Sequence, residues 1–405
     1  MTTTSYWLEE PGEPFLRSKT SGAVDVAVIG GGVTGCSCAL TLASRGIRVR
    51  LYEARTIAGG ASGRNGGFAL RGAAGAYDEV RERLGCEPAR ALWELTERTL
   101  ERIEELGGDS FRRVGSLRLA ADPAEWEALE REHAALRDDG FRVEWADGLQ
   151  HPLDTLFHGA IVHPSDGALH PVSWVRRLAR LAAAAGAEIV ERTRVDVDVA
   201  AAHADTVVVA TDGLTSQALP EFADVLWPVR GQVVVTEPLV ERLFPRPHYA
   251  RGGYDYWQQL PNGRLVVGGK RDASFDTENT ADESTTPLIQ GRLEALAADL
   301  LGRLPAITHR WAGAWGTTLD LLPLVGRVPD RGRVWVAGGY AGHGNVLGFA
   351  CGDGVARAVL GDAVPEMALF DPVRLLGARD PQNETRGTSP SPSSASSAAT
   401  ATARS

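Results

Sequence analysis

The feature that most constrains this chain is an apolar strand followed at once by a glycine-rich turn and an apolar helix. Residues 24–30 (VDVAVIG) are apolar enough to form a strand that is buried on both faces. Residues 30–35 have the spacing G-x-G-x-x-G, and a helix is expected over residues 36–44. A second strand, residues 49–52, ends at Glu53. This order predicts a βαβ unit and therefore a parallel sheet.

Each residue type in this unit suits a pyrophosphate ligand. Gly30 allows a tight turn, Gly32 lets a pyrophosphate approach the backbone, and Gly35 lets the helix pack closely on the strand. The start of the helix offers free N–H groups and the positive end of its dipole. Glu53 would accept hydrogen bonds from ribose hydroxyls, and its charge would repel a 2′-phosphate. We therefore predict a dinucleotide site that disfavours NADP.

A second glycine-rich loop favours FAD over NAD. Residues 59–67 (GGASGRNGG) directly follow the acidic strand end. An NAD site does not need such a loop. Its backbone N–H groups, with the side chains of Ser62 and Arg64, can reach the pyrophosphate and the isoalloxazine of an extended FAD molecule.

Two later segments fit the same site. Residues 334–339 (VWVAGG) predict a strand, which is followed by the turn 340–345 (YAGHGN) and by an apolar helix that ends near Leu360. Such a turn would aim a helix N-terminus at the N1/C2=O edge of a flavin, where negative charge gathers on reduction. His343 lies in this turn, and we expect it near the flavin. Residues 205–213 (DTVVVATDG) predict one more strand of the nucleotide-binding sheet.

Composition limits the class of protein. A chain of 405 residues can form two or three domains. Four cysteines without paired or zinc-type spacing exclude a disulfide scaffold and predict no metal site. A net charge of −10 argues against nucleic-acid binding. Because we find neither a signal peptide nor an apolar stretch of membrane-spanning length, we expect a cytoplasmic protein without membrane insertion.

Together these motifs resemble the D-amino-acid oxidase superfamily. The resemblance covers residues 5–372 and includes 166–171 (DGALHP) and 316–327 (GTTLDLLPLVGR) besides the segments above. Within this superfamily the chain is most similar to the branch that contains the glycine, sarcosine and gamma-glutamylputrescine oxidases. The opening Ser5-Tyr6-Trp7 and residues 315–317 (WGT) favour the gamma-glutamylputrescine oxidase-like group.

The resemblance implies a two-domain fold of the α/β and α+β classes. A discontinuous Rossmann-type FAD-binding domain would use residues 20–80, 151–222 and 323–375. A β-rich substrate domain would use residues 81–150 and 223–322. An N-terminal arm (1–19) and a disordered tail (381–405), which is rich in Ser, Ala, Thr and Pro, complete the chain.

Periodicity gives elements for the second domain independently of the resemblance. It predicts two helices and two strands, over residues 77–106, 123–136, 229–236 and 265–269. Between residues 193–195 and 204–206, where relatives carry a small β-meander, this chain has only a few residues, which would leave the adenine end more open.

Motifs and resemblance together predict the site residues. The expected FAD contacts are Gly30, Gly32, Val33, Thr34, Gly35, Glu53, Ala54, Ser62, Gly63, Arg64, Asn65, Gly66, Gly67, Val195, Ala210, Thr211, Gly339, Gly342, His343, Gly344 and Asn345. His343, Trp315 and Tyr256 are the candidate catalytic residues, with Tyr254 and Trp257 as further pocket aromatics. A role in the core is the alternative for each of these four aromatic residues. No cysteine lies where some relatives attach flavin covalently, so noncovalent FAD is expected.

In this family the C–H next to the substrate nitrogen delivers a hydride to flavin N5, which gives an imine and, in an oxidase, hydrogen peroxide. Amino-acid oxidases of the family commonly hold the substrate carboxylate with an arginine just before the G-T motif, but residues 311–317 (WAGAWGT) contain none. We therefore favour an amine or an extended N-substituted substrate. The alternative is a glycine, sarcosine or D-amino-acid oxidase or dehydrogenase in which another arginine, such as Arg251 or Arg310, binds the carboxylate.

Four further points remain open from the sequence. Lys270 could assist oxygen reduction, as a lysine does in some relatives, or be a solvated surface residue. The electron acceptor is O2 or another carrier. A flavin monooxygenase is disfavoured because we see no second fingerprint for NADPH, and a non-enzymatic flavin-fold module is disfavoured because no flavin-facing motif is lost.

Overall fold

The first predicted unit forms as the sequence indicates. In the computed structural model, which describes residues 4–9, 12, 15 and 22–376, β1 (Val24–Ile29), α1 (Val33–Ser44) and β2 (Val49–Tyr52) follow one another, and β1 pairs in parallel with β2. Helix α1 begins earlier than expected, within the glycine turn itself. The last glycine of the motif is therefore helical.

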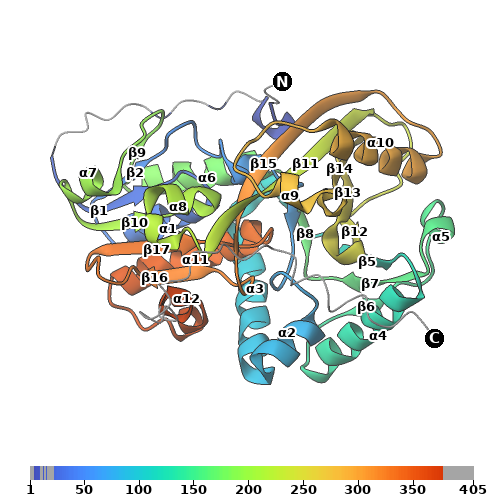
Figure 1. Ribbon diagram of the computed structural model, residues 1–405, viewed down its shortest axis with the longest axis horizontal. Coiled ribbons are helices and arrows are strands. Elements are labelled where there is room, and N and C mark those ends of the chain that lie inside the picture. Colours follow the sequence, from blue (N-terminus) through green and yellow to red (C-terminus); the bar gives the residue numbers. More distant parts are fainter. Residues whose placement is uncertain (1–3, 10–11, 13–14, 16–21, 377–405) are drawn as a thin grey trace, which may run out of the picture.

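This unit belongs to a six-stranded sheet with the order β16-β17-β10-β1-β2-β9 (Figure 1). Its other strands are β9 (Glu188–Val190), β10 (Ala204–Val209), β16 (Leu324–Arg327) and β17 (Val334–Gly338). Only β16 is antiparallel to its neighbour. Alternate residues of β1 face opposite sides, with Val26 and Val28 in one core cluster and Ala27 and Ile29 in another. The sheet is thus buried on both faces, as its apolar strands predict.

Long helices cover this sheet. α1 packs against α6 (Pro171–Ala184) and α11 (Gly344–Val359), and α11 also contacts α3 (Cys86–Gly107). The shortened stretch after Val195 contains the small helix α7 (Val197–Ala201). Other short helices are α5 (Leu153–Leu156), α8 (Thr215–Ala218), α9 (Phe275–Glu278) and α12 (Val373–Leu376).

A second, eight-stranded sheet has the order β15-β11-β14-β13-β12-β5-β7-β6 and lies on the right of Figure 1. Its strands are β5 (Ser116–Ala120), β6 (Glu144–Trp145), β7 (Gly159–His163), β11 (Leu226–Pro238), β12 (His248–Ala250), β13 (Asp255–Gln259), β14 (Arg264–Gly269) and β15 (Ile307–Thr318). Helix α10 (Pro287–Leu301) packs on one face, whereas Val233, Val266 and Trp311 on the other face join the core cluster of α1. One face of this sheet therefore looks toward the nucleotide-binding unit.

A small three-stranded sheet joins segments that are far apart in sequence. It has the order β3-β8-β4, with β3 (Phe68–Ala69), β8 (Gly167–Leu169) and β4 (Phe111–Arg112). The fold is the predicted combination of an α/β unit and a β-rich unit. The stretch 151–222 divides, however, because β7 pairs within the eight-stranded sheet and β9 and β10 within the six-stranded one. The domain boundaries therefore stay a proposal.

The helix predicted over residues 77–106 is wrong in one respect, because it is two helices. α2 (Tyr77–Leu84) and α3 are separated at Gly85, whose φ of 87° is outside the helical region. α4 (Pro123–Asp138) follows the prediction, with Asp122 as its N-cap.

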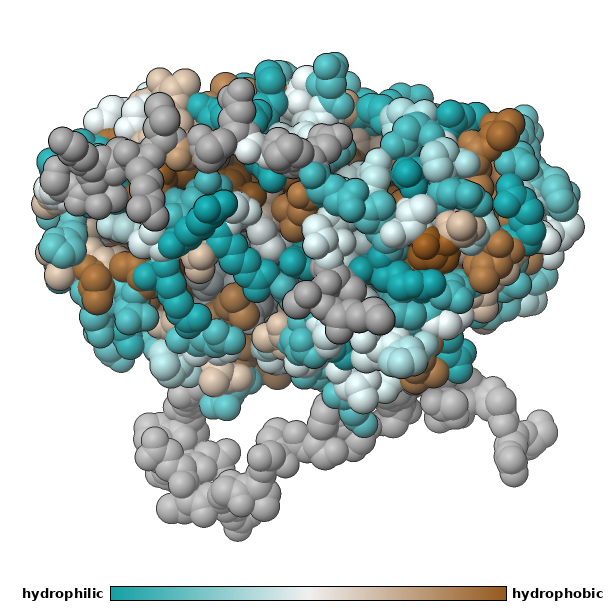
Figure 2. Space-filling model, turned by 90° about the horizontal axis from the view of Figure 1, so that it is seen from above, coloured by the Kyte–Doolittle hydropathy of each residue, from teal (hydrophilic) through white to brown (hydrophobic). Residues whose placement is uncertain are grey.

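Among the residues that the structure describes, no helix is long and apolar enough to cross a bilayer. On the face in Figure 2, hydrophobic residues are scattered among hydrophilic ones. The predicted tail at 381–405 and most of the predicted arm at 1–19 lie outside the described residues.

Candidate functional site

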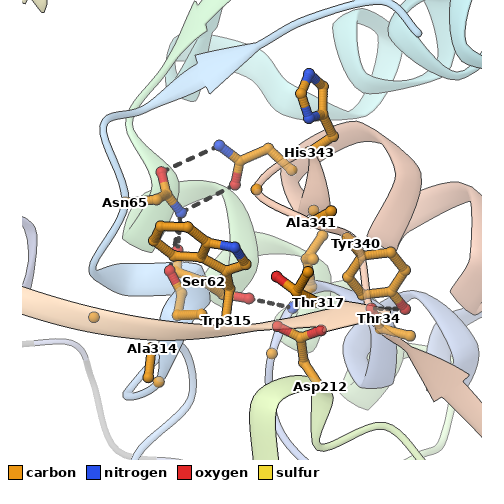
Figure 3. Close-up of a pocket in the computed structure, with 18 of the residues that line it drawn as sticks. Thr34, Ser62, Asn65, Asp212, Ala314, Trp315, Thr317, Tyr340, Ala341 and His343 are labelled. Atoms are coloured by element: carbon orange, nitrogen blue, oxygen red, sulfur yellow. Dashed lines mark hydrogen bonds between the residues drawn. The ribbon is translucent and has the colours of Figure 1, made fainter. Parts of the chain in front are cut away.

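One large cavity takes its lining from both large sheets. Its volume is about 870 Å³, and it extends from the glycine turn after β1 to Arg118 of β5 and Tyr249 of β12 in the eight-stranded sheet. Figure 3 shows one part of it, with Thr317 beside Asp212 and with Ser62 and Asn65 on the side of Trp315. Along its length the cavity has a backbone-rich end and an end lined by aromatic and charged side chains.

The glycine turn leaves no room for side chains. Gly30 has a φ of 114°, and a Cβ added there would lie 2.4 Å from the carbonyl oxygen of Ala210. A Cβ on Gly35 would lie 1.9 Å from the carbonyl oxygen of Gly30. The N-cap of α1 is Gly32, and the next N–H, of Val33, donates to Ser62 Oγ (3.0 Å). The turn thus offers a bare helix N-terminus of the kind that binds phosphate groups.

Glu53 lies at the end of β2, beside this turn. Its Oε2 accepts from the N–H of Gly31 and its Oε1 from the N–H of Arg55, both at 2.7 Å. Burial raises the pKa of Glu53, although these two backbone donors oppose the shift. The carboxylate lines the cavity together with Ala54, Val195, Ala210 and Thr211.

The loop at residues 59–67 is held from outside the cavity through its carbonyl groups. Three buried side chains from distant segments donate to three successive carbonyl oxygens: Ser5 Oγ to Gly63 (2.8 Å), Trp311 Nε1 to Arg64 (2.9 Å) and Trp7 Nε1 to Asn65 (2.8 Å). The side chains of Ser62, Arg64 and Asn65 line the cavity. The N-terminal Ser5-Tyr6-Trp7 segment therefore positions the loop.

Besides the glycine turn and the loop at residues 59–67, the turns at the ends of β10 and β17 form part of the cavity wall. Asp212, in a left-handed conformation (φ 47°), accepts from the N–H of Gly316 and from the N–H of Gly339, both at 2.9 Å. This carboxylate joins the ends of β10, β15 and β17, and its burial raises its pKa. At the start of α11, Asn65 and Asn345 exchange amide hydrogen bonds of 3.1 Å (Figure 3).

His343 is the N-cap residue of α11 and has a buried, unpartnered ring nitrogen. Nδ1 has no hydrogen-bond partner among the described residues, and burial lowers the pKa of the imidazole to about 4. The ring is therefore neutral at neutral pH. An orphaned polar atom on a cavity wall needs a ligand or water as its partner.

Most predicted cofactor residues line the cavity, but four glycines do not. Gly35, Gly63, Gly67 and Gly339 lie behind it, where an added Cβ would come within 1.9 to 2.6 Å of Gly30 O, Ala58 O, Leu169 O and the Thr318 methyl, respectively. Their absence from the wall has a physical reason, since they allow close packing of the backbone that forms it.

The residues expected to bind the substrate differ more from the prediction than those expected to bind the cofactor. Trp315, Tyr256 and Tyr254 line the cavity, but Trp257 is fully buried under α10 because alternate residues of β13 face opposite sides. Lys270 does not line the cavity; its side chain is 20% exposed, and its Nζ pairs with Asp255 at 2.6 Å. Arg251 also pairs with Asp255. Neither Arg251 nor Arg310, the two arginines suggested as carboxylate ligands, lines the cavity. Arg310 pairs with Glu294.

Sequence reasoning missed the charged groups that do line this end. Arg271 packs over the rings of Tyr254 (4.9 Å to the centroid) and Trp315 (5.9 Å) and makes no ion pair within the described residues. Arg118 pairs with Glu132. The only sequence signal for Arg118 is a cation at an alternate position of the apolar strand Ser116–Ala120.

Comparisons with known proteins decide what this cavity holds. The model of the FAD dependent oxidoreductase family matches residues 25–358, which is most of the chain. This chain belongs to the FAD-dependent oxidoreductase family. It is 29% identical to the gamma-glutamylputrescine oxidoreductase of Escherichia coli over 89% of this chain and 90% of that protein. It is 28% identical to the glycine oxidase of Bacillus licheniformis over 84% and 94%.

A solved structure agrees with the family. Glycine oxidase from Geobacillus kaustophilus superposes with a TM-score of 0.70 at 25% identity, covering 87% of this chain and 98% of that one. The resemblance to this superfamily and the predicted two-domain FAD fold are thus confirmed, and the protein is an FAD-dependent oxidoreductase.

The residues present fit FAD. The bare turn at Gly30–Gly32 suits the pyrophosphate, Glu53 the ribose, and the unpartnered Nδ1 of His343 at the start of α11 a polar ring edge. None of the four cysteines, all of which lie in the described part of the chain, lines the cavity. Noncovalent binding therefore stays our prediction. Among the described residues no group of three or more His, Cys, Asp or Glu is arranged for a metal.

Proposed function

We propose that this enzyme oxidises the C–N bond of an amine, in the manner of a gamma-glutamylputrescine oxidase, to an imine. The observation that carries the proposal is the composition of the cavity beyond the cofactor turn. Tyr254, Tyr256 and Trp315 form an aromatic wall there, and Ala314 stands beside Trp315 in the stretch where an amino-acid oxidase would carry its arginine. The reacting end of the amine is held by apolar contact rather than through a carboxylate next to the reacting carbon.

The enclosing residues favour the reactive form of the amine. Only a neutral amine has the nitrogen lone pair that forms the C=N bond as the hydride leaves carbon. Burial disfavours an ammonium ion, and the cation of Arg271 beside Trp315 disfavours it further. His343 is neutral and adds no charge. Burial and the charge of Arg271 therefore favour the neutral form of the bound amine.

The proposed reaction is a two-electron oxidation of the amine. The carbon next to nitrogen loses a hydride, the nitrogen loses a proton, and water then hydrolyses the imine to a carbonyl compound and a smaller amine or ammonia. Bound FAD supplies the acceptor for the hydride, and O2 reoxidises it to give hydrogen peroxide if the enzyme is an oxidase. The chain supplies position and excludes water.

Arg271 favours a second candidate, oxidation of an amino acid such as glycine, sarcosine or a D-amino acid. Its guanidinium lines the cavity near Trp315 without an acidic partner in the described residues. A carboxylate would satisfy it. Arg271, rather than Arg251 or Arg310, is then the replacement for the missing arginine.

Anaerobic mixing separates the two candidates. Primary and N-substituted amines, glycine, sarcosine and D-amino acids are added to the holoenzyme, and the visible flavin absorbance is followed. We expect bleaching by amines that persists in Arg271→Met. Bleaching only by amino acids, and its loss in Arg271→Met, would establish the second candidate instead. Readmitting air and assaying peroxide then identifies O2 or another carrier as the acceptor.

We also propose a cytoplasmic location. All four cysteines are free thiols, and three of them, Cys36, Cys38 and Cys351, are buried packing residues. Separate assays of membrane, periplasmic and cytoplasmic fractions for the protein test this.

A further inference from the structure

We propose that the end of the cavity remote from the cofactor turn binds a carboxylate of the substrate, through Arg118 assisted by Tyr249. The substrate class is then an extended amine with its oxidised C–N bond at one end and an anionic, acceptor-rich group at the other. The inference rests on the proposed function, because it describes the far end of the same amine.

A row of side chains across the eight-stranded sheet sets the direction. Arg118 of β5 is in register with Tyr249 of β12, and Tyr249 with Tyr256 of β13. In-register side chains of neighbouring strands share one face, and all three residues line the cavity. Tyr256 marks the flavin side, because its ring contacts Phe68 (5.6 Å between centroids) and lies against Gly66.

The spacing of this row suits an extended molecule. Neighbouring strands lie about 4.8 Å apart, so the backbone of Arg118 is about 10 Å from that of Tyr256. A substrate that reacts beside Tyr256 and Trp315 must therefore be several atoms long to reach Arg118. Glycine and sarcosine are shorter than this backbone separation.

Arg118 keeps hydrogen-bond donors that the protein does not use. Its Nη1 donates to Glu132, but Nε and Nη2 have no partner among the described residues, and the side chain is 17% exposed, on the cavity wall. Burial alone would lower the pKa of this guanidinium, yet Glu132 and nearby acids raise it overall. The Tyr249 hydroxyl likewise has no partner in the described chain, and burial raises its pKa, so it stays protonated.

His163 adds another unused donor at this end of the cavity. Arg71 Nη2 lies 3.3 Å from its Nδ1, and because arginine can only donate, Nδ1 is the acceptor. Burial lowers the pKa of His163 well below its ordinary value, so the ring is neutral and Nε2 carries the proton. That buried N–H has no partner among the described residues.

The acids at this end, in contrast, each have a donor within the chain. Glu132 accepts from Arg118 and from the N–H of Tyr77 (3.3 Å). Asp166 accepts from the N–H of Arg71 (2.8 Å) and from Ser116 Oγ (2.6 Å). The remaining acid, Glu79, is exposed and accepts from the N–H of Ala76 at the start of α2. Free donors beside satisfied acceptors select a ligand that brings acceptors, which is what a carboxylate does.

Two measurements on the holoenzyme test the site. Calorimetry compares the binding affinity of unbranched carboxylates with that of n-alkanols of equal length, and this measurement does not depend on oxidation of the ligand. Anaerobic flavin reduction compares ω-amino carboxylates with n-alkylamines and diamines. We expect the carboxylate-bearing member of each pair to bind more tightly by about tenfold or more, with an optimum at intermediate chain length.

Matched variants assign the preference to a residue. Arg118→Lys keeps a cation beside Glu132 but lacks the planar fork of donors, and Arg118→Met with Glu132→Gln removes the pair without leaving a buried charge. Both are expected to lose the carboxylate preference while alkylamines bind as before. Arg271→Met, the rival arginine, is expected to keep it.

The outcomes separate the two proposals. An equal loss for carboxylates and alkylamines in the Arg118 variants would make Arg118 merely structural. Loss of the preference in Arg271→Met alone, or tighter binding of diamines than of ω-amino carboxylates, would also overturn the inference. A carboxylate preference that depends on Arg118, in an enzyme whose flavin no amine reduces, would leave this site standing and refute the proposed amine oxidation.

Discussion

The two ends of the cavity differ in the groups that form them, which are mainly backbone groups at one end and side chains at the other. The cofactor end is built on strand ends, glycines and backbone N–H groups, and its acids Glu53 and Asp212 accept hydrogen bonds from that backbone. The distal end consists of side chains on one face of a sheet, where Arg118, Tyr249 and Tyr256 come together through strand register. Geometry at the first end depends on side chains being absent, whereas specificity at the second depends on which side chains are present.

The largest effect is expected where a side chain is forbidden. In Gly35→Ala the new Cβ would lie 1.9 Å from the Gly30 carbonyl oxygen and separate α1 from β1. Overpacking of this kind costs about 1 to 3 kcal/mol or more, so we expect a less stable protein that is purified without flavin. Flavin content and the thermal midpoint are the measurements. Gly291→Ala, also in a helix but with open space around it, is the matched control and should retain FAD. Full FAD content in Gly35→Ala would contradict the account.

Acid should destabilise the cofactor end through His343. The folded-state pKa is about 4 against an ordinary 6.5, so between these values the unfolded chain binds more protons than the native one, and stability falls as pH falls. The loss amounts to at most about 3 kcal/mol and is absent above about pH 6.5. Urea unfolding of the holoenzyme at several pH values should show a shallower acid loss in His343→Gln. His151→Asn, at an exposed position, should match wild type. Parallel profiles for wild type and His343→Gln would refute the assignment.

Glu53→Gln tests the charged acceptor of the cofactor end. Hydrogen bonds to a charged group contribute about 1.5 to 3 kcal/mol, so the Kd for FAD should rise by about 10- to 100-fold. Titration of the apoprotein with FAD measures this. Asp205→Asn, an exposed acid of β10, serves as the control. Equal Kd values for Glu53→Gln and wild type would remove Glu53 from the site.

The smallest effect belongs to the distal end. Tyr249→Phe removes one neutral donor, which contributes about 1 kcal/mol, so ω-amino carboxylates should bind about fivefold more weakly. FAD affinity and alkylamine binding should not change, because the ring that packs on the sheet remains. A change in FAD affinity would show that the two ends are not independent.

Sequence could predict the cofactor end because its determinants are local. Spacing alone located β1, β2 and the glycine turn, since glycine, strand and acid must follow one another in a βαβ unit. The residues that hold the loop at 59–67 in place, Trp7 and Trp311, are far from it in sequence and gave no local signal.

The distal end could not be predicted in the same way. Arg118 and Tyr249 meet only through the parallel pairing of β5 with β12, and strand register between distant segments has no sequence signature. The error at Trp257 was avoidable, because the twofold period of a strand allows Tyr256 or Trp257 to face the cavity but not both. The break at Gly85 was likewise signalled by the glycine itself.

The most direct test of the central claim is an anaerobic titration of the holoenzyme with the amine that reduces it fastest. Flavin absorbance and carbonyl product are measured in the same samples. The account predicts equimolar loss of oxidised flavin and formation of the carbonyl compound from the amine. An enzyme with fully bound FAD that dithionite reduces, but that no amine or amino acid reduces, would contradict it.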